Sequence, residues 1–353
     1  MGKLRIADLE TPVLLLDLDC MHSNLQIMAE YFLCTTAKLR PHFKNHQVLS
    51  LAARQIEAGA TGITCARLDH AEALVQHGIT NILVANEIAG ESMIRQFVDL
   101  SRRAPVIIAV DNPKIVSDMA RIAGGRAHEL NVVVDLDVGL RRCGVSSAEA
   151  ALSLTNIVMR EGLRFRGLMG YGGNLRIATG PEKASSVRAL LKPLLDAKAL
   201  IEDAGIAVEI VSCGSTGDYS ITATFPGVTE IQAGSYLLMD TGYAPFAPEF
   251  SRALTVLATV VSKTASERVV VDAGLKALGF DKDMPMVKGN LDLRVRTIHA
   301  EHAILDIMDQ SFSIEVGDKI EIWIQCLDSA IQLHQRMYGL RNNQVEETFE
   351  IER

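Results

Sequence analysis

The feature that most restricts the fold of this chain is an alternation of short β-branched runs with helical stretches, which continues to about Tyr243. Most of the stretches between the runs space their apolar residues as a helix does, for example 48–58, 69–76 and 182–204. Strands that alternate with helices predict parallel βαβ units. The runs occupy residues 13–17, 39–44, 62–66, 81–86, 106–111, 132–137, 165–171, 210–214 and 229–236.

These nine runs are one more than the eight strands with which a TIM-type barrel closes. The run at 13–17 is the spare one, because it precedes the series of strands whose ends carry polar residues. The sequence therefore predicts an α/β fold, a (β/α)8 TIM-type barrel over residues 20–243.

After Tyr243 the helical spacing disappears. Runs at 254–261, 268–272, 291–298 and 319–323 alternate or are rich in β-formers, and Gly-containing turns separate them. This pattern predicts a second, C-terminal antiparallel β domain over residues 244–353, joined by the N-terminal strand within 1–19.

Charge and composition exclude several classes of protein. The formal net charge is −8 and the basic residues form no tract, which argues against a nucleic-acid surface. No apolar run approaches the roughly 20 residues of a membrane span, and the N-terminus lacks the pattern of a secretory signal. The six cysteines form no CxxC pair, so neither a zinc knuckle nor a disulfide framework is expected. We expect a cytoplasmic protein with no nucleic-acid or membrane partner.

The first barrel strand ends in Arg40-Pro41-His42-Phe43-Lys44. In this fold the catalytic groups lie at the C-terminal ends of the strands. A lysine there is partly desolvated, which lowers the pKa of its amine and lets it form a Schiff base. The alternative is a surface lysine whose stem covers the rim of the barrel.

Two later strands end in small and hydroxyl-bearing residues. Small residues let backbone N–H groups approach a phosphate, and hydroxyl groups can donate to it. The loops after the seventh and eighth strands are also the usual phosphate site of a TIM-type barrel. The alternative is that both segments are ordinary turns. The segments are Gly214-Ser215-Thr216-Gly217 and Gln232-Ala233-Gly234-Ser235-Tyr236.

Two intermediate strands add further candidates. Arg141 and Arg142 follow the fifth barrel strand, and either guanidinium could bind a ring oxygen or a substrate carboxylate. The alternative is an ion pair with Asp135 or Asp137. Tyr171 ends the sixth strand, where it either faces a bound ring or packs at the rim.

In this order along the chain, these motifs resemble the D-threonine aldolase and D-serine dehydratase family. That family belongs to the alanine-racemase-like, fold-type III enzymes, which use pyridoxal phosphate. The resemblance runs from Thr11 to about Tyr338. The motifs are Thr11-Pro12, Arg40-Pro41-His42-x-Lys44, Asp137-x-Gly139-x-x-Arg142-x-Gly144-Val145, Gly214-Ser215-Thr216-Gly217, Val271-Asp272-Ala273-Gly274-Leu275-Lys276 and Glu301-His302.

The resemblance implies pyridoxal 5'-phosphate as the cofactor, with Lys44 forming the Schiff base. Arg142 would then lie near the phenolic oxygen of the cofactor ring, and the 214–217 and 232–236 segments would hold the phosphate. It also implies a homodimer with shared active sites, in which the C-terminal domain closes the site of the partner subunit.

The chain departs from the family in two places. Many members bind a divalent metal (Mn, Mg or Zn) through a His-x-Cys or His-x-Asp pair, and the matching residues here are Cys326 and Asp328. Thiolate and carboxylate are legitimate ligands, and a strand would bring both onto one face. The alternative is a buried Cys and a capping Asp. Asn174 stands near a place where related sequences often have His, so proton transfer there would pass to His42 or to Lys44.

Three reactions are compatible with this resemblance. The leading prediction is an aldolase that splits a β-hydroxy D-amino acid into a smaller amino acid and an aldehyde. The alternatives are a D-serine dehydratase-like ammonia-lyase and an amino-acid racemase, in which Lys44 is the base. A non-catalytic carrier of pyridoxal phosphate is a contrasting class, but such proteins resemble the barrel alone.

Overall fold

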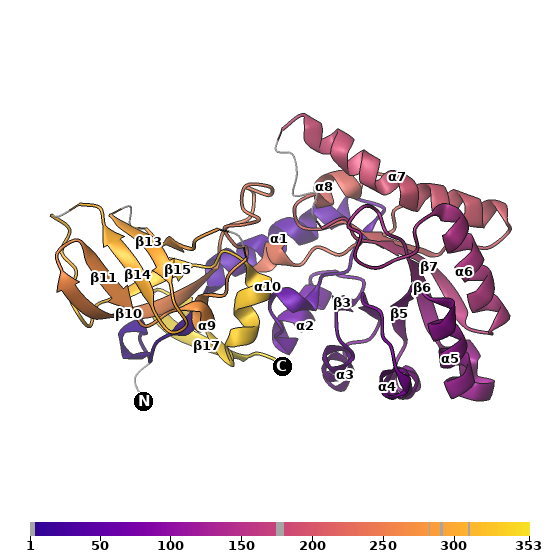
Figure 1. Cartoon of the computed structure of the whole chain (residues 1–353), viewed down its shortest axis with the longest axis horizontal. Helices are drawn as coiled ribbons and strands as arrows, with labels where there is room; N and C mark the ends of the chain where they lie inside the picture. Colours follow the sequence, from indigo (N-terminus) through magenta and orange to yellow (C-terminus); the bar gives the residue numbers. More distant parts are fainter. Residues whose placement is uncertain (1–3, 174–179, 282, 290–291, 310) are drawn as a thin grey trace. The chain divides into compact units, whose positions relative to one another are not determined.

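The computed structural model of this protein describes residues 4–173, 180–281, 283–289, 292–309 and 311–353, and it divides into two compact units (Figure 1). The barrel unit comprises Met28–Lys44 and Leu51–Gly234, and the β unit comprises Met1–Ile27, Asn45–Ser50 and Ser235–Arg353. The predicted domain limits, 20–243 for the barrel and 244–353 with 1–19 for the β domain, stay a prediction.

Eight strands form the sheet of the barrel unit, and every neighbouring pair in it is parallel. Most are short runs of fully buried side chains, as expected for strands with both faces covered. The strands are β2 (Lys38–Leu39), β3 (Ile63–Cys65), β4 (Ile82–Val84), β5 (Val106–Val110), β6 (Asn131–Asp135), β7 (Arg164–Gly170), β8 (Ile210–Cys213) and β9 (Glu230–Ile231).

Backbone hydrogen bonds close this sheet on itself. Neighbouring strands are hydrogen-bonded in the order β2-β9-β8-β7-β6-β5-β4-β3. The N–H groups of Thr61 and Thr64 donate to the carbonyls of Leu39 and Pro41, each at 2.8 Å, and His42 forms a parallel bridge with Thr64. The first and second strands of the series are thereby joined, so the predicted eight-stranded barrel is confirmed.

The helices alternate with these strands, and in Figure 1 α4 to α7 lie outside them. The predicted helices at 48–58, 69–76 and 182–204 correspond to α2, α3 and α7. Capping defines some helix starts: the Asn112 side chain accepts from the Lys114 N–H at 2.9 Å, with Pro113 in the first turn. The helices are α1 (Leu18–Leu33), α2 (Leu49–Glu57), α3 (Leu68–Gln76), α4 (Glu91–Ser101), α5 (Pro113–Ala123), α6 (Ala148–Arg160), α7 (Glu182–Asp203) and α8 (Tyr219–Thr222), with 3-10 turns η2 (Phe43–Asn45) and η3 (Gly124–Glu129).

The β unit contains a nine-stranded sheet that is antiparallel except where β1 pairs with β16. The run at 13–17, left over from the barrel series, is β1 and lies between β10 and β16 with Leu14, Leu15 and Leu16 buried. Its strands are β1 (Val13–Asp17), β10 (Leu254–Ala265), β11 (Arg268–Val271), β12 (Met286–Val287), β13 (Leu293–Ile298), β14 (Ala303–Ile307), β15 (Lys319–Trp323), β16 (Arg336–Arg341) and β17 (Gln344–Glu350). Short helical turns complete the unit: η1 (Ile6–Asp8), η4 (Ser235–Leu237), α9 (Leu275–Leu278), α10 (Leu327–Ala330) and η5 (Ile331–Leu333).

No helix in the described part of the chain is long and apolar enough to cross a membrane.

A buried ion pair fixes the end of β2, where the predicted cofactor lysine begins its turn. The Arg40 guanidinium donates to both carboxylate oxygens of Glu230, at 2.7 and 2.5 Å, and to the Asn81 carbonyl at 2.5 Å. Gly62 lies directly against this arrangement, and a β-carbon there would collide with the Asn81 carbonyl and with Arg40. Glycine is therefore required at position 62.

We expect Gly62→Ala to destabilise the barrel by about 3 kcal/mol, because the added methyl overpacks a buried charge pair that cannot move into solvent. Gly125→Ala is the matched control, since nothing lies within 4 Å of a β-carbon at that position. Thermal and urea unfolding should show a clear loss of stability in the first variant and a change below about 1 kcal/mol in the second. Equal stability of the two variants would contradict the packing described here.

Candidate functional site

Three predicted site residues meet at the C-terminal ends of the barrel strands. Lys44 lies in η2, the turn after β2, Tyr171 directly follows β7, and Arg142 follows β6. The Lys44 amine lies 5.9 Å from the centre of the Tyr171 ring, and the Arg142 guanidinium carbon lies 5.6 Å from it. Two cations facing one aromatic ring form a site for an anionic, planar group. Lys44 and Tyr171 are half-buried, and Arg142 is exposed.

His42 is oriented by the backbone of this same turn. Its Nδ1 accepts the N–H of Lys44 at 3.4 Å. In the neutral imidazole the proton then resides on Nε2, so His42 presents a donor rather than a free base. Between the two candidates for proton transfer, this geometry favours Lys44 as the base.

The predicted phosphate turn follows β8 and contains an acidic residue that the sequence analysis did not weigh. The backbone N–H and the hydroxyl of Ser215 both donate to Asp218 Oδ1, at 2.6 and 2.9 Å. Burial raises the pKa of the Asp218 carboxyl above its usual range. Thr216 is buried and Gly217 half-buried in the same turn. Both donors of Ser215 are therefore directed at Asp218. Phosphate binding by Ser215, Thr216 and Gly217 stays a prediction.

The second predicted phosphate segment follows β9 and is wholly buried. Gln232 donates through Nε2 to the Ser212 hydroxyl at 2.9 Å, and Gly234 ends the barrel unit. Ser235 and Tyr236 belong to the β unit. There the Ser235 hydroxyl accepts from the Asn45 amide at 3.2 Å, and the Tyr236 ring packs 5.8 Å from that of Phe250.

The Cys326 and Asp328 pair does not lie on a strand, so the strand geometry expected for it is wrong. Cys326 is the residue before α10, and Asp328 lies within that helix. Asp328 Oδ1 accepts the Asn45 amide at 2.6 Å, and burial raises the pKa of the Cys326 thiol. The role of this pair as metal ligands stays a prediction.

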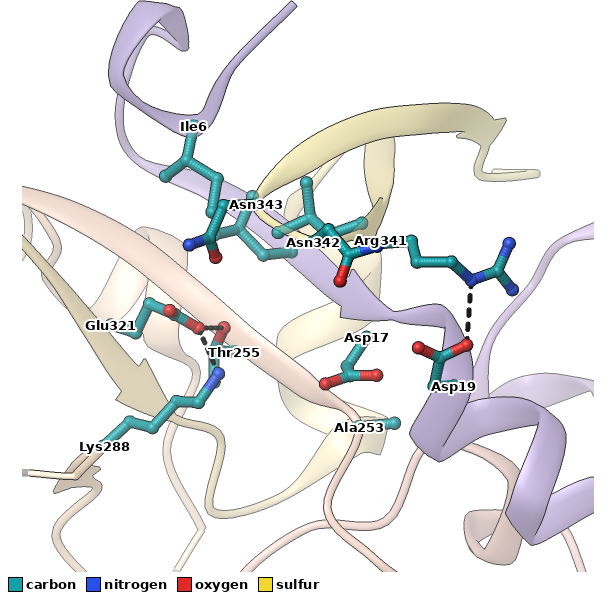
Figure 2. A pocket seen from close by; sticks show the side chains of 12 residues that line it. Ile6, Asp17, Asp19, Ala253, Thr255, Lys288, Glu321, Arg341, Asn342 and Asn343 are labelled. Atoms are coloured by element: carbon teal, nitrogen blue, oxygen red, sulfur yellow. Dashed lines mark hydrogen bonds and ion pairs between the residues drawn. The ribbon is translucent and has the colours of Figure 1, made fainter.

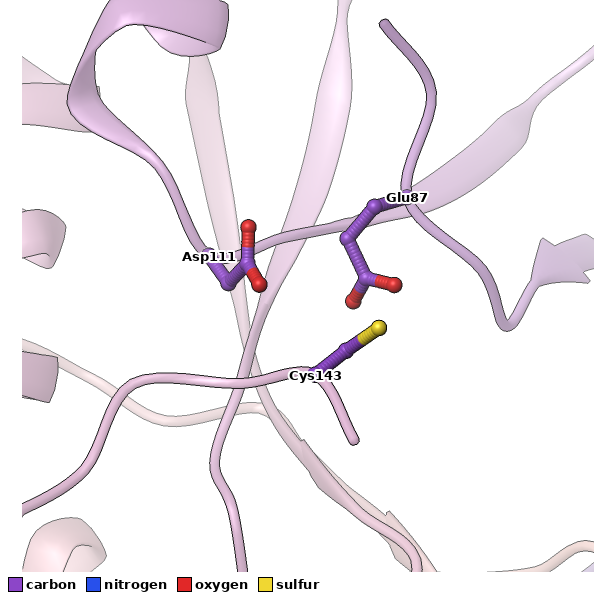
Figure 3. Close-up of side chains that lie close together, drawn as sticks. All are labelled: Glu87, Asp111 and Cys143. Carbon is purple, nitrogen blue, oxygen red and sulfur yellow. The ribbon is translucent and has the colours of Figure 1, made fainter. Parts of the chain in front are cut away.

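Glu87, Asp111 and Cys143 form a cluster at the ends of β4, β5 and β6 that the sequence analysis missed (Figure 3). One ligand atom from each lies within 4.8 Å of the others. The signal was present, because Glu87 and Asp111 fall at or just after consecutive predicted strands. Asp135, at the end of β6, interacts with the same two carboxylates.

Asp135 is the most perturbed carboxyl of this group. It is 5% exposed, and its burial, followed by the charges of Glu87 and Asp111, raises its pKa to about 8. Arg142 opposes the shift. Two facing carboxylates cannot hydrogen-bond to each other unless one of them holds a proton. A proton on Asp135 therefore relieves the charge repulsion within this group at neutral pH.

A separate small cavity of about 130 Å³ lies in the β unit (Figure 2). Most of its charged groups pair with one another: Lys288 Nζ lies 2.8 Å from Glu321, and Arg341 donates to Asp19 at 2.8 Å. The remaining carboxylate, Asp17, accepts the Cys20 N–H at 2.9 Å. Because each of these charged groups already has a partner within the protein, no ligand chemistry is assigned to this cavity.

Comparison with known proteins now identifies the family. Residues 16–242 match the alanine racemase N-terminal domain, and residues 253–340 match a putative serine dehydratase domain. The chain is 32% identical over 354 residues to the D-threonine aldolase of an Arthrobacter species, covering 98% of this chain and 93% of the relative. The chain belongs to the fold-type III pyridoxal phosphate family. The resemblance seen in the motifs is confirmed.

Two further comparisons bear on this fold-type III enzyme. A D-threo-3-hydroxyaspartate dehydratase of Delftia sp. (strain HT23) is 30% identical over 336 residues, covering 89% of this chain and 88% of the relative. The crystal structure of the D-threonine aldolase from Filomicrobium marinum superimposes with a TM-score of 0.95 at 31% identity, covering 99% of this chain and 97% of that one. The fold-type III architecture therefore extends over both units. Asn174, the second departure from the family, lies outside the described residues.

The raised pKa of Asp135 predicts a specific pH dependence of stability. Between its unfolded pKa near 3.8 and its folded pKa near 8, the folded chain holds a proton that the unfolded chain has lost. The contribution of Asp135 to the free energy of unfolding therefore decreases by about 1.4 kcal/mol for each unit that the pH rises within this range. In chelating buffer we expect Asp135→Asn to gain Tm relative to the wild type between pH 5 and pH 8.5. A Tm difference that stays constant over that range would contradict the shift.

Proposed function

We propose that this protein is a pyridoxal phosphate-dependent D-amino-acid aldolase, which cleaves a β-hydroxy D-amino acid into a smaller amino acid and an aldehyde. The observation that carries the proposal is the match to D-threonine aldolases over both units, together with Lys44 at the end of the first barrel strand. The relatives that match nearly the whole chain are lyases, which favours an enzyme over a cofactor carrier.

The residues present fit a phosphorylated pyridine aldehyde. Lys44 offers an amine for covalent attachment, Arg142 offers a fixed positive charge, and Tyr171 offers a ring face between them. Thr216 and Gly217 offer donors at the end of β8, the position where barrels of this kind hold phosphate. When bound, the cofactor supplies an electron sink for negative charge at Cα.

The protein decides which bond at Cα breaks, through the groups it aims at the substrate. Cleavage of Cα–Cβ requires removal of the β-hydroxyl proton, and the Lys44 Nζ is the base that the geometry favours. His42 presents its Nε2 proton as a hydrogen-bond donor and therefore orients an oxygen of the substrate or cofactor. The guanidinium group of Arg142 would hold an anionic oxygen of the cofactor or of the substrate with its N–H donors.

The second candidate is a dehydratase that acts on D-serine-like substrates. The match of residues 253–340 to a putative serine dehydratase domain, and the Delftia relative, favour it. In that reaction Lys44 would remove the Cα proton instead of the hydroxyl proton. Racemisation, the third reaction, would use the same base.

Three expectations from the sequence enter this proposal unchanged. The enzyme works as a homodimer with shared active sites, it takes a small amino acid, and it resides in the cytoplasm. A divalent ion (Mn, Mg or Zn) at Cys326 and Asp328 would assist by lowering the pKa of a bound hydroxyl. No proton step above depends on that ion.

The decisive assay incubates the holoenzyme with D-threonine, D-serine and D-alanine and measures acetaldehyde, pyruvate and L-alanine. We expect acetaldehyde from D-threonine, and we expect Lys44→Ala to lose both this product and the visible absorption of the bound cofactor. Lys38→Ala is the matched control, because Lys38 is an exposed lysine on β2, the strand that leads into the Lys44 turn. Pyruvate as the dominant product would support the dehydratase, and a colourless wild type would reject both. Activity that survives chelation would remove the need for a chelatable ion.

Asp218 provides a test of the phosphate turn. A carboxylate beside a phosphate dianion costs affinity, while an amide at this position would still accept the Ser215 N–H. We expect Asp218→Asn to bind pyridoxal phosphate about three- to tenfold more tightly, roughly 1 kcal/mol. Because burial raises the pKa of Asp218, the gain should grow with pH as the wild-type carboxyl ionises. Asp203→Asn, at the exposed end of α7, controls for net charge, and equal affinity of all three proteins at pH 8.5 would argue against phosphate in this turn.

A further inference from the structure

The acidic cluster in the barrel unit combines two carboxylates and a thiol from three separate loops. Glu87, Asp111 and Cys143 follow β4, β5 and β6, and Figure 3 shows their side chains converging from different segments. Among the residues that the structure describes, these three are the one group of His, Cys, Asp or Glu side chains whose ligand atoms lie close enough together to share an ion.

The loop that carries Cys143 is built to return to the end of β6. The Asp137 N–H donates to the Val145 carbonyl at 3.0 Å, and the Val145 N–H donates to the Asp135 carbonyl at 2.9 Å. Gly144 has φ +100° and lies so close to this hairpin that a β-carbon would approach the Asp137 nitrogen at 2.5 Å. The Gly144 N–H also donates to Asp111 Oδ2 at 3.1 Å. The backbone therefore fixes Cys143 beside Asp111.

A second observation at the same place concerns buried oxygens without donors. Asp135 is 5% exposed, and its Oδ1 has no hydrogen-bond partner among the described residues. Glu87 Oε1 is also buried without a partner, and the two side chains interact with each other, so a proton or a cation between them would satisfy both. Buried oxygen atoms normally receive a donor or a cation, because leaving them bare costs the full desolvation penalty.

We propose that Glu87, Asp111 and Cys143 bind a divalent cation of borderline softness, Zn²⁺ or a similar ion, with Asp135 as a neighbouring acidic group. Tetrahedral zinc with bonds of about 2.0–2.3 Å sets its ligand atoms about 3.3–3.7 Å apart. The ligand atoms of the three residues lie within 4.8 Å of one another, and rotations of the side chains would bring them to the zinc spacing. Three protein ligands leave a fourth position for water.

The mixed ligand set selects the ion. A thiolate favours Zn²⁺ and other late transition metals over Mg²⁺ or Ca²⁺, which prefer oxygen alone. On binding, the Cys143 S–H bond breaks, its proton passes to solvent, and a metal–sulfur bond forms in its place. The charge of the ion then offsets the carboxylates that face one another at this end of the barrel.

This site is separate from the Cys326 and Asp328 pair, which belongs to the other unit. Both sets contain one cysteine, so cysteine substitutions distinguish them. The proposal is also independent of the proposed aldolase reaction, because its test counts ions and records spectra without a substrate.

The experiment strips the holoenzyme with a chelator, reloads it with Zn²⁺, removes the excess and counts zinc per chain by elemental analysis. We expect Glu87→Gln and Cys143→Ser each to hold one zinc fewer than the wild type. Cys326→Ser should retain that zinc. Equal zinc in the wild type and Glu87→Gln, or loss confined to Cys326→Ser, would overturn the proposal.

Cobalt provides a readout that survives misfolding of a cluster variant. Co²⁺ bound to a thiolate gives a charge-transfer band in the near ultraviolet, recorded as a difference spectrum against the metal-free holoenzyme. We expect this band in Cys326→Ser, where Cys143 is the thiolate that remains at a candidate site. Its absence from that variant would overturn the proposal even if Cys143→Ser fails to fold.

Discussion

The buried pair of Arg40 and Glu230 holds the end of β2, from which the chain turns to Lys44. The two side chains are 2% and 9% exposed. Taking such charges out of water costs several kcal/mol, which well-aligned hydrogen bonds between the two groups offset. Here two parallel hydrogen bonds join the end of β2 to the start of β9, and a third reaches the Asn81 carbonyl just before β4. Arg40 therefore anchors the chain four residues before Lys44. The closed barrel and the position of the reactive amine share this one anchor.

From that anchor, the ends of the strands divide into a cationic side and an acidic side. Lys44 and Arg142 face the Tyr171 ring, whereas Glu87 and Asp111 lie together with Asp135. Arg142 belongs to both sides, because it faces the ring and also offsets the charge of Asp135. A cofactor site and an acidic cluster at one rim are thus electrostatically linked. Changing the charge of either would be felt by the other.

Local patterns predicted the elements well. The helical spacing at 182–204 and the apolar run at 106–111 match α7 and β5. Burial of one helix face leaves a period in the sequence, and burial of both strand faces leaves a continuous apolar run. The sequence patterns did not predict features that depend on contacts between distant segments. Cys326 and Asp328 lie at a short helix instead of a strand, since a four-residue helix has no period to detect. The motif at 214–217 did not reveal the bond between Ser215 and Asp218, because Asp218 lies one residue beyond it.

The sequence by itself determined the fold class, the family and the identity of Lys44 as the candidate lysine, since strand-end motifs in a fixed order carry that information. The tertiary structure decided which strand ends meet. Glu87, Asp111 and Cys143 are up to 56 residues apart in the chain, and nothing local links them. They come together because parallel strands align their carboxyl ends at one rim, and because the loop after β6 folds back on itself. Charge interactions between such groups exist only once the barrel has closed.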